Sequence, residues 1–162
     1  MSRKLDWFYF WYFVIHVPVT VLIDSCLVIP KEWQTTVQRS IVLFHVSTNN
    51  DFLLAKPPLW LQVFGFYELV FQLPLFIYGA VQLYQNNRQV YPWLIIYGFN
   101  AAFTTSVCLV YVIMEGAAHG LTNGQICSLF GLYVPYLIIP VFILVDSTRR
   151  VLGFLNTKIK TQ

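Results

Sequence analysis

The side chains best suited to chemistry are two carboxylic acids that stand inside long apolar stretches. Asp24 lies near the end of the stretch 7–29, and Glu68 lies in the first half of the stretch 60–84. Ionisable groups in such a setting are costly, so each is expected to serve a function and to have a partner. Two carboxyl groups that share a site of low dielectric constant cannot both ionise cheaply. We therefore expect one neutral carboxyl that donates a hydrogen bond and one carboxylate that binds a cation, such as the protonated amine of an amphiphile.

A purely structural role is the competing interpretation. Asp24 would then satisfy polar backbone or pair with His16, and it would lock helices without binding a ligand. The two residues are eight positions apart, which places them about 80° apart around a helix, so direct pairing is awkward. We favour ligand binding for Asp24 and Glu68, whereas His16 taken alone is expected to be a hydrogen-bonded histidine of the helix bundle.

The composition of the chain points to lipid as its solvent. Of its 162 residues, 57% are hydrophobic and only 10% are charged. Soluble domains carry about a quarter charged residues, so these charges are too few to cover a water-soluble globule. The apolar composition excludes disorder, and a net charge of +3 without a basic stripe excludes a nucleic-acid-binding domain. Three cysteines without a CxxC motif indicate neither a disulfide scaffold nor a dithiol redox centre.

Four apolar segments are long enough to cross a membrane as helices. A spanning helix needs roughly 20 residues, and the segments 7–29, 60–84, 92–114 and 126–145 reach that length. Continuous apolar runs exclude a lipid-facing β-barrel, whose strands alternate. The sequence predicts an all-α membrane protein, a four-transmembrane-helix bundle that forms one domain over 1–162. A basic cytosolic tail, 146–162, is expected to follow the last helix, and 36–46 is expected to form a short interfacial helix over the bundle.

The placement of basic residues predicts the orientation. Most fall in the N-terminal segment, the 2–3 loop and the tail, namely Arg3, Lys4, Arg88, Arg149, Arg150, Lys158 and Lys160. The others, Lys31, Arg39 and Lys56, fall in the loop between the first two helices. By the positive-inside rule both termini are cytosolic and that loop is lumenal.

The end of the tail predicts a location. Lys158 and Lys160 match the register of a dilysine retrieval signal. An ordinary basic tail beside acidic lipid headgroups is the alternative. We favour the signal, and we therefore expect a multi-pass protein of the endoplasmic-reticulum membrane.

On this topology, polar side chains converge in the lumenal half of the bundle. The helical rise places Asp24 about 8 Å and Glu68 about 12 Å from the lumenal ends of their helices. Gln72 lies one turn from Glu68 on the same face. Further polar side chains fall at similar depths: Thr104, Thr105, Tyr133 and Tyr136. The convergence predicts a polar chamber inside the bundle.

Prolines inside three spans support such a chamber. Pro18, Pro74 and Pro140 each remove a helical donor from the carbonyl one turn earlier, which for Pro140 is that of Tyr136. Kinked helices cannot pack closely along their full length, and a neighbouring group must satisfy the freed carbonyl. An internal cavity is therefore expected.

Four strings carry a family resemblance. They are HVPVTVLID at 16–24, PPLW at 57–60, YELVFQLP at 67–74 and YVPYLIIP at 133–140. Together they resemble the EXPERA family, in order from about residue 6 to residue 144, and most closely its sigma-2-receptor branch. The resemblance implies a homodimeric four-helix protein of the endoplasmic reticulum whose pocket opens sideways to lipid. It also implies binding of sterols and cationic amphiphiles, and a role in sterol homeostasis or trafficking.

The resemblance also assigns roles to residues. The expected ligand-binding residues combine positions that match the pocket of the family with residues of the polar chamber described above. They are Asp24, Glu68, Gln72, Tyr136, His16 and Thr104. Asp51 matches an acidic loop position for which a structural role is expected. No catalytic residue, metal or cofactor is expected.

Two other functions stay open. The related emopamil-binding branch is a sterol Δ8–Δ7 isomerase with a His-x-x-x-Glu motif on the first helix of the fold. This chain has His16 followed by Thr20 in that register. Asp24 and Glu68 could still serve as acid and base, so an isomerase is the first alternative. The second is a small membrane adaptor that binds a sterol transporter.

Overall fold

The computed structural model describes residues 3–159, and over this range the chain folds into helices without a strand. Four helical segments of the described chain are long and apolar enough to cross a membrane: Arg3–Leu27, Leu59–Tyr84, Arg88–Glu115 and Asn123–Asn156. The prediction of an all-α protein with four candidate membrane spans is confirmed.

The first two spans are interrupted helices. The first consists of α1 (Arg3–Leu22) and a 3₁₀ turn, η1 (Asp24–Leu27). The second consists of α4 (Leu59–Tyr67), a π-helical turn, η2 (Glu68–Gln72), and α5 (Leu73–Tyr84).

The other two spans follow a short 3₁₀ turn, η3 (Arg88–Val90). The third is α6 (Tyr91–Glu115), and the fourth consists of α7 (Asn123–Tyr133) and α8 (Pro135–Ile159). The fourth span was expected to end near residue 145, but α8 continues far beyond it, so much of the expected tail is helical. The side chain of Lys158 and the whole of Lys160 lie outside the described residues, so the retrieval signal stays a prediction.

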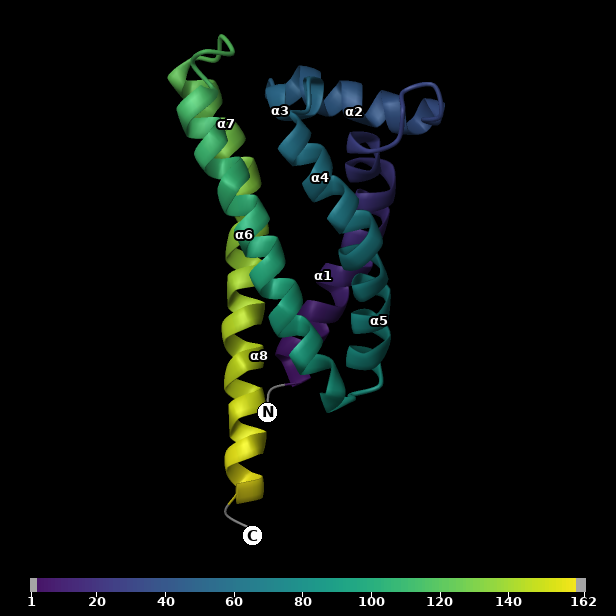
Figure 1. Ribbon diagram of the computed structural model, residues 1–162, viewed down its shortest axis with the longest axis vertical. Coiled ribbons are helices and arrows are strands. Elements are labelled where there is room, and N and C mark those ends of the chain that lie inside the picture. Colours follow the sequence, from purple (N-terminus) through teal and green to yellow (C-terminus); the bar gives the residue numbers. More distant parts are fainter. Residues whose placement is uncertain (1–2, 160–162) are drawn as a thin grey trace.

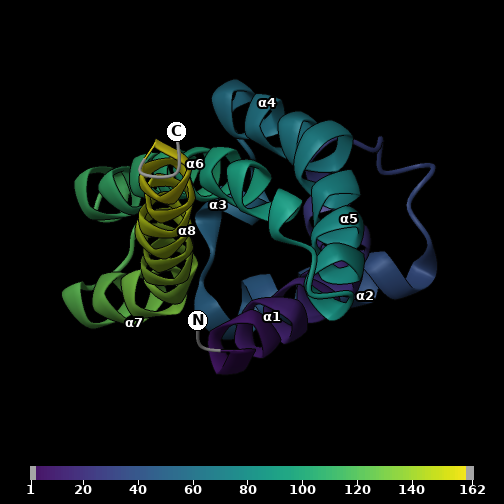
Figure 2. The same cartoon turned by 90° about the horizontal axis from the view of Figure 1, so that it is seen from below.

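The helices form two pairs that meet at one end and diverge toward the other. In one pair α1 packs along α5, and in the other α6 packs along α8. Figure 1 shows the pairs converging near the start of α1 and the turn between α5 and α6. Seen from that end, α6 and α8 lie on one side, with α1 and α5 on the other (Figure 2). We call this end the narrow end and the opposite end the wide end.

Two short helices from the 1–2 loop cross the wide end. They are α2 (Thr36–Asn49) and α3 (Phe52–Ala55). Thr35 begins α2 with a capping box, because its hydroxyl accepts from the Gln38 N–H and the Gln38 side chain accepts from the Thr35 N–H. The predicted helix over the bundle is confirmed. Gln38 also donates to the carbonyl of Val21 at 3.0 Å, which ties α2 to the end of α1.

Aromatic packing joins the pairs toward the narrow end. The ring of Tyr97 on α6 contacts those of Phe13 on α1 and Phe76 on α5 edge to face, at centroid distances of 5.1 and 5.4 Å. All three side chains are fully buried or nearly so. In lipid, where the hydrophobic effect does not hold helices together, such close packing carries the association.

A buried ion-pair cluster closes the narrow end. Arg150 on α8 donates from Nη1 to Asp6 on α1 at 2.6 Å and from Nε to Asp146 at 2.8 Å. Its Nη1 also lies 2.7 Å from the hydroxyl of Tyr91 on α6, and Tyr9 donates to Asp146 at 2.9 Å. Three helices therefore share one arginine, which is buried with 6% of its side chain exposed. The pairing neutralises a cation that would otherwise be costly to bury.

Of the three prolines expected to kink the spans, Pro18 lies inside the continuous helix α1 and Pro140 inside α8, and the winding of the helix changes next to Pro74. Pro140 frees the carbonyl of Tyr136, and the hydroxyl of Thr105 donates to that carbonyl at 3.2 Å. Ahead of Pro74 the helix widens into the π-turn η2, in which the N–H of Leu73 donates to the carbonyl of Glu68. The expected full-length helix over 7–29 is wrong in detail, because α1 ends at Leu22 and Asp24 opens the 3₁₀ turn η1.

Gly98 is expected to be essential for the packing of α6 against α8. A Cβ atom at this position would lie 2.7 Å from the carbonyl oxygen of Pro140 and 2.9 Å from the N of Leu144, and backbone cannot move away cheaply. Gly98→Ala should therefore destabilise the protein by about 1–3 kcal/mol, measured as a lower melting temperature in detergent. Gly131→Ala is the matched control, since its Cβ would have nothing within 4 Å. Equal melting temperatures for the two variants would contradict the close approach.

Candidate functional site

A cavity of about 320 Å³ lies between the two helix pairs. Its wall includes all of the residues expected to bind a ligand, namely Asp24, Glu68, Gln72, Tyr136, His16 and Thr104. Thr105 and Tyr133, which were expected at the same depth, also line it. The structure therefore brings the candidate residues together around one space. Whether they bind a ligand is taken up as a proposal below.

The two acids touch each other on the cavity wall. The hydroxyl of Thr20 donates to Oε1 of Glu68 at 2.9 Å, and the side chain of Asp24 is hydrogen-bonded to both Glu68 and Thr20. A hydrogen bond between two carboxyl groups needs at least one proton, so the pair carries at most one negative charge. Within residues 3–159, the ion pairs involve other acids, so this charge has no basic partner from the chain.

Local breaks in the helices place this pair. Because α1 ends at Leu22, the chain turns at Ile23, and Asp24 enters η1 on the same wall as Glu68. Side chains satisfy the carbonyls left free there, since Ser25 donates to Val21 at 2.7 Å. Glu68 lies at the first position of the π-turn, a feature frequently found at functional sites.

Hydrogen-bonded side chains form the cavity wall toward the narrow end. Gln72 donates to Oδ1 of Asn100 at 2.8 Å, which joins η2 to α6. Tyr97 donates to the hydroxyl of Tyr12 at 3.0 Å, which joins α6 to α1. Thr104 donates its hydroxyl hydrogen to the backbone carbonyl of Asn100 at 3.1 Å, so its oxygen is left only as an acceptor.

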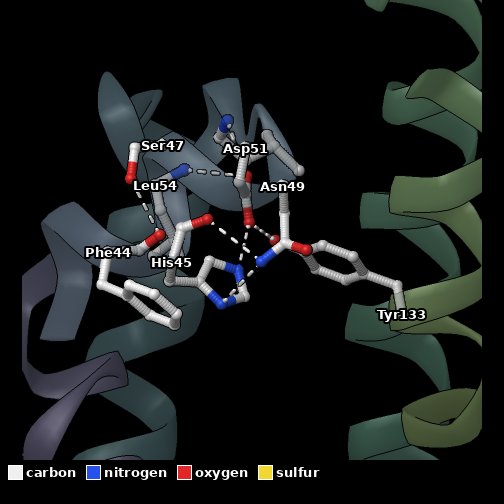
Figure 3. Close-up of polar contacts among 8 residues, drawn as sticks. Phe44, His45, Ser47, Asn49, Asp51, Leu54 and Tyr133 are labelled. Atoms are coloured by element: carbon white, nitrogen blue, oxygen red, sulfur yellow. Dashed lines mark hydrogen bonds and ion pairs between the residues drawn. The ribbon is translucent and has the colours of Figure 1, made fainter.

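Asp51 forms a network at the wide end of the cavity (Figure 3). It is fully buried and caps α3 through the N–H groups of Leu53 and Leu54. Its Oδ2 lies 3.1 Å from Nε2 of His45 on α2 and accepts from the hydroxyl of Tyr133 on α7 at 2.9 Å. In Figure 3, Tyr133 reaches across from the opposite helix pair to this carboxylate. Asp51 thus ties the α2–α3 segment to α7, in agreement with the structural role expected for it.

Removal of the Tyr133 hydroxyl should loosen this tie without changing the acidic pair. Tyr133→Phe is expected to lower the free energy of unfolding by about 1–2 kcal/mol, because Asp51 keeps its other bonds but loses one buried donor. The control is Tyr111→Phe, since Tyr111 packs against Trp60 and Phe52 without a hydrogen bond to its hydroxyl among the described residues. Thermal melting in detergent measures both. A Tyr133→Phe protein as stable as the Tyr111→Phe protein would refute the tie.

Several wall residues escaped the sequence analysis. Tyr12, Tyr97 and Cys108 line the cavity, and Asn100 bonds to Gln72 beside it. The tyrosines resemble the many other aromatic residues of the spans and carry no separate signal. Asn100 is an amide in the middle of an apolar span, so it was the one residue of these that the sequence could have singled out.

Comparison with known proteins gives one family and several relatives. Residues 37–147 match the EXPERA family (EXPanded EBP superfamily). The chain is 38% identical over 153 residues to "Efficient mitochondria targeting-associated protein 19" of Saccharomyces cerevisiae, covering 86% of this chain and 95% of that protein. It is 30% identical over 159 residues to "Sigma intracellular receptor 2" of Homo sapiens, covering 91% of this chain and 89% of that protein. The Xenopus tropicalis protein of the same name is 29% identical over 153 residues, with coverages of 88% and 87%.

Proposed function

Since this chain belongs to the EXPERA family, we propose that it binds sterols and cationic amphiphiles in its acidic cavity and takes part in sterol homeostasis or trafficking. One observation carries the proposal. A pair of carboxyl groups, Asp24 and Glu68, lies on the wall of a cavity between helices that can span a membrane, and no basic side chain of the described residues pairs with it.

The chemistry of the cavity selects its ligand. A protonated amine supplies the missing positive charge and donates hydrogen bonds to the carboxylate, and such charge-assisted bonds are the strong ones. Tyr136, which also lines the wall, is partly exposed, and an aromatic ring beside a bound cation attracts it. The remaining wall is largely apolar, with Leu27, Leu61, Phe64, Ala101 and Leu132. A rigid apolar lipid body fits such a wall, and this combination favours amphiphiles over polar solutes.

Binding without turnover is the part of the proposal that separates it from the isomerase alternative. Double-bond migration needs a proton donor and a proton acceptor at two carbon atoms of the ring. Thr20 stands where the isomerase pattern has a glutamate, and its hydroxyl donates to Glu68. A hydroxyl is too weak an acid to protonate an alkene. Asp24 lies four residues later in the 3₁₀ turn η1, outside the helix on which the isomerase pattern has its glutamate.

Mass spectrometry of co-purified lipids tests the proposal. The wild-type protein is expected to carry a sterol that Glu68→Gln protein loses. A cell line lacking sterol Δ8–Δ7 isomerase tests the alternative, and expression of this protein should leave its Δ8-sterols unconverted. Conversion above the empty-vector background, lost with Glu68→Gln, would instead make the protein an isomerase. Equal sterol content in the wild-type and Glu68→Gln proteins would mean that the acidic pair does not contribute to sterol binding.

The proposal includes a location. We propose an endoplasmic-reticulum protein with both termini in the cytosol, the α2–α3 segment in the lumen, and a homodimeric state. Tags at both ends should be accessible to protease in permeabilised cells with intact internal membranes. Replacement of Lys158 and Lys160 by serine should shift the protein out of the endoplasmic reticulum. A protected C-terminal tag would contradict the orientation.

A further inference from the structure

His16 on α1 holds a fixed position in the cavity wall, one turn from Thr20 toward the narrow end. Four residues of helix correspond to about 6 Å along the axis. Only 8% of His16 is exposed, and its ring packs at centroid distances of 4.1 Å from Tyr12, 5.3 Å from Phe76 and 5.5 Å from Tyr136. The ring is therefore held in one orientation beside the space that the ligand would fill.

The hydrogen bond of His16 assigns the proton on its ring. Its Nδ1 lies 3.0 Å from the backbone carbonyl of Tyr12. A carbonyl oxygen only accepts, so Nδ1 carries the hydrogen. Of the acidic groups on the packed elements, Asp24 and Glu68 bond to each other and to Thr20, and Asp6 and Asp146 bond to Arg150. The buried ring has no carboxylate of its own and is neutral. Its Nε2 is then an acceptor, and it has no partner within the described part of the chain.

Tyr12 supplies the complementary group. Its hydroxyl oxygen accepts from Tyr97 at 3.0 Å, and its own hydrogen has no acceptor among residues 3–159. Tyr12 and His16 both line the cavity, and their rings lie against each other. An open donor and an open acceptor thus lie side by side.

We propose that His16 and Tyr12 bind the hydroxyl group of a lipid alcohol, at a position separate from the acidic pair that binds amines. An alcohol is both a donor and an acceptor, so its hydrogen goes to Nε2 of His16 and its oxygen accepts from Tyr12. A protonated amine has no lone pair for Tyr12 and finds no negative charge there. This inference rests on the proposed function, and it identifies the hydroxyl group as the part of the sterol that the site recognises. It places the hydroxyl end of a sterol toward the narrow end of the molecule.

The test compares cholesterol with its 3-methyl ether, which keeps the acceptor oxygen and loses the donor hydrogen. The wild-type protein in lipid nanodiscs should bind the alcohol about tenfold more tightly than the ether, since the ether leaves Nε2 without a partner. His16→Phe keeps the aromatic packing and should abolish this preference. His16→Gln offers an acceptor oxygen and should keep part of it.

A second probe separates this site from the acidic pair and checks the fold. N,N-dimethylhexadecylamine has a cationic head and no hydroxyl, so His16→Phe and His16→Gln proteins should bind it with equal affinity within about twofold, although only His16→Gln keeps part of the preference for the alcohol. Asp24→Asn should show a different pattern: amine binding is lost and the affinity for sterol falls, but the alcohol is still bound more tightly than the ether. A His16→Phe protein that binds the amine and still prefers the alcohol would overturn the inference alone. A wild-type protein that binds neither probe would overturn the proposed function, and the inference with it.

Discussion

Asp24→Asn and Glu68→Gln should each weaken the binding of N,N-dimethylhexadecylamine by about thirtyfold or more. The two carboxyls are hydrogen-bonded to each other on the cavity wall, and in the proposed binding state they share one proton and one negative charge. An amide in place of the charged carboxylate removes the counter-ion of the ligand. An amide in place of the neutral carboxyl replaces its shared proton and disturbs the geometry held by Thr20. Loss of one partner of a buried charge pair costs about 2–5 kcal/mol.

The measurement is equilibrium binding to purified protein at equal expression. Glu115→Gln is the matched control for Glu68→Gln, because Glu115 ends α6 as an exposed residue away from the cavity wall. It should bind the amine like the wild type. If Asp24→Asn and Glu68→Gln protein also bound it like the wild type, the acids would serve only the packing of the helices.

Arg150→Met is expected to have the largest effect on stability, about 3–5 kcal/mol. The arginine pairs with Asp6 and Asp146 in a buried cluster, so its removal leaves two carboxylates without their cation. Because the cluster joins α1, α6 and α8, its loss should separate the two helix pairs at the narrow end. Thermal melting and limited proteolysis in detergent would report this loss.

Two further variants make the Arg150 experiment specific. Arg149→Met changes the same residue type at an exposed neighbouring position and should melt like the wild type. A triple variant, Asp6→Asn with Asp146→Asn and Arg150→Met, has no uncompensated charge and should recover much of the stability. Equal melting temperatures for Arg150→Met and Arg149→Met protein would refute the role of the cluster.

The same cluster is the reason why the sequence did not predict the full length of the last helix. Arg149 and Arg150 follow the apolar segment 126–145 after three polar residues, so they looked like part of a basic tail. In the structure Arg150 pairs with Asp6 near the other end of the chain, so it is buried within the helix α8, which continues to Ile159. A partner 144 positions away leaves no local pattern in the sequence.

The spans and the convergence of polar residues were predictable for simple reasons. Hydropathy over about 20 residues defines a span, and the helical rise gives the depth of each polar residue. Depth alone correctly suggested that Asp24 and Glu68 would share a level. The sequence did not predict the backbone features that bring the two side chains together. The end of α1 at Leu22 and the π-turn at Glu68 depend on tertiary contacts.

His16 illustrates the limit of reasoning about single residues. Its sequence neighbours suggest a satisfied histidine, and one ring nitrogen is indeed satisfied by the carbonyl of Tyr12. The second nitrogen has no partner among the described residues, and only the structure shows that His16 and Tyr12 line one cavity.

Photolabelling with a sterol that carries a diazirine in its ring system tests the central claim most directly. The labelled peptides, mapped by mass spectrometry, should contain cavity-wall residues from both helix pairs, such as Val19 and Ile23 on one side and Leu132 on the other. Excess N,N-dimethylhexadecylamine should suppress this labelling in the wild type. Labels confined to outward-facing residues such as Phe103 and Ile113, unaffected by the amine, would mean that sterols only surround the protein and would contradict the account.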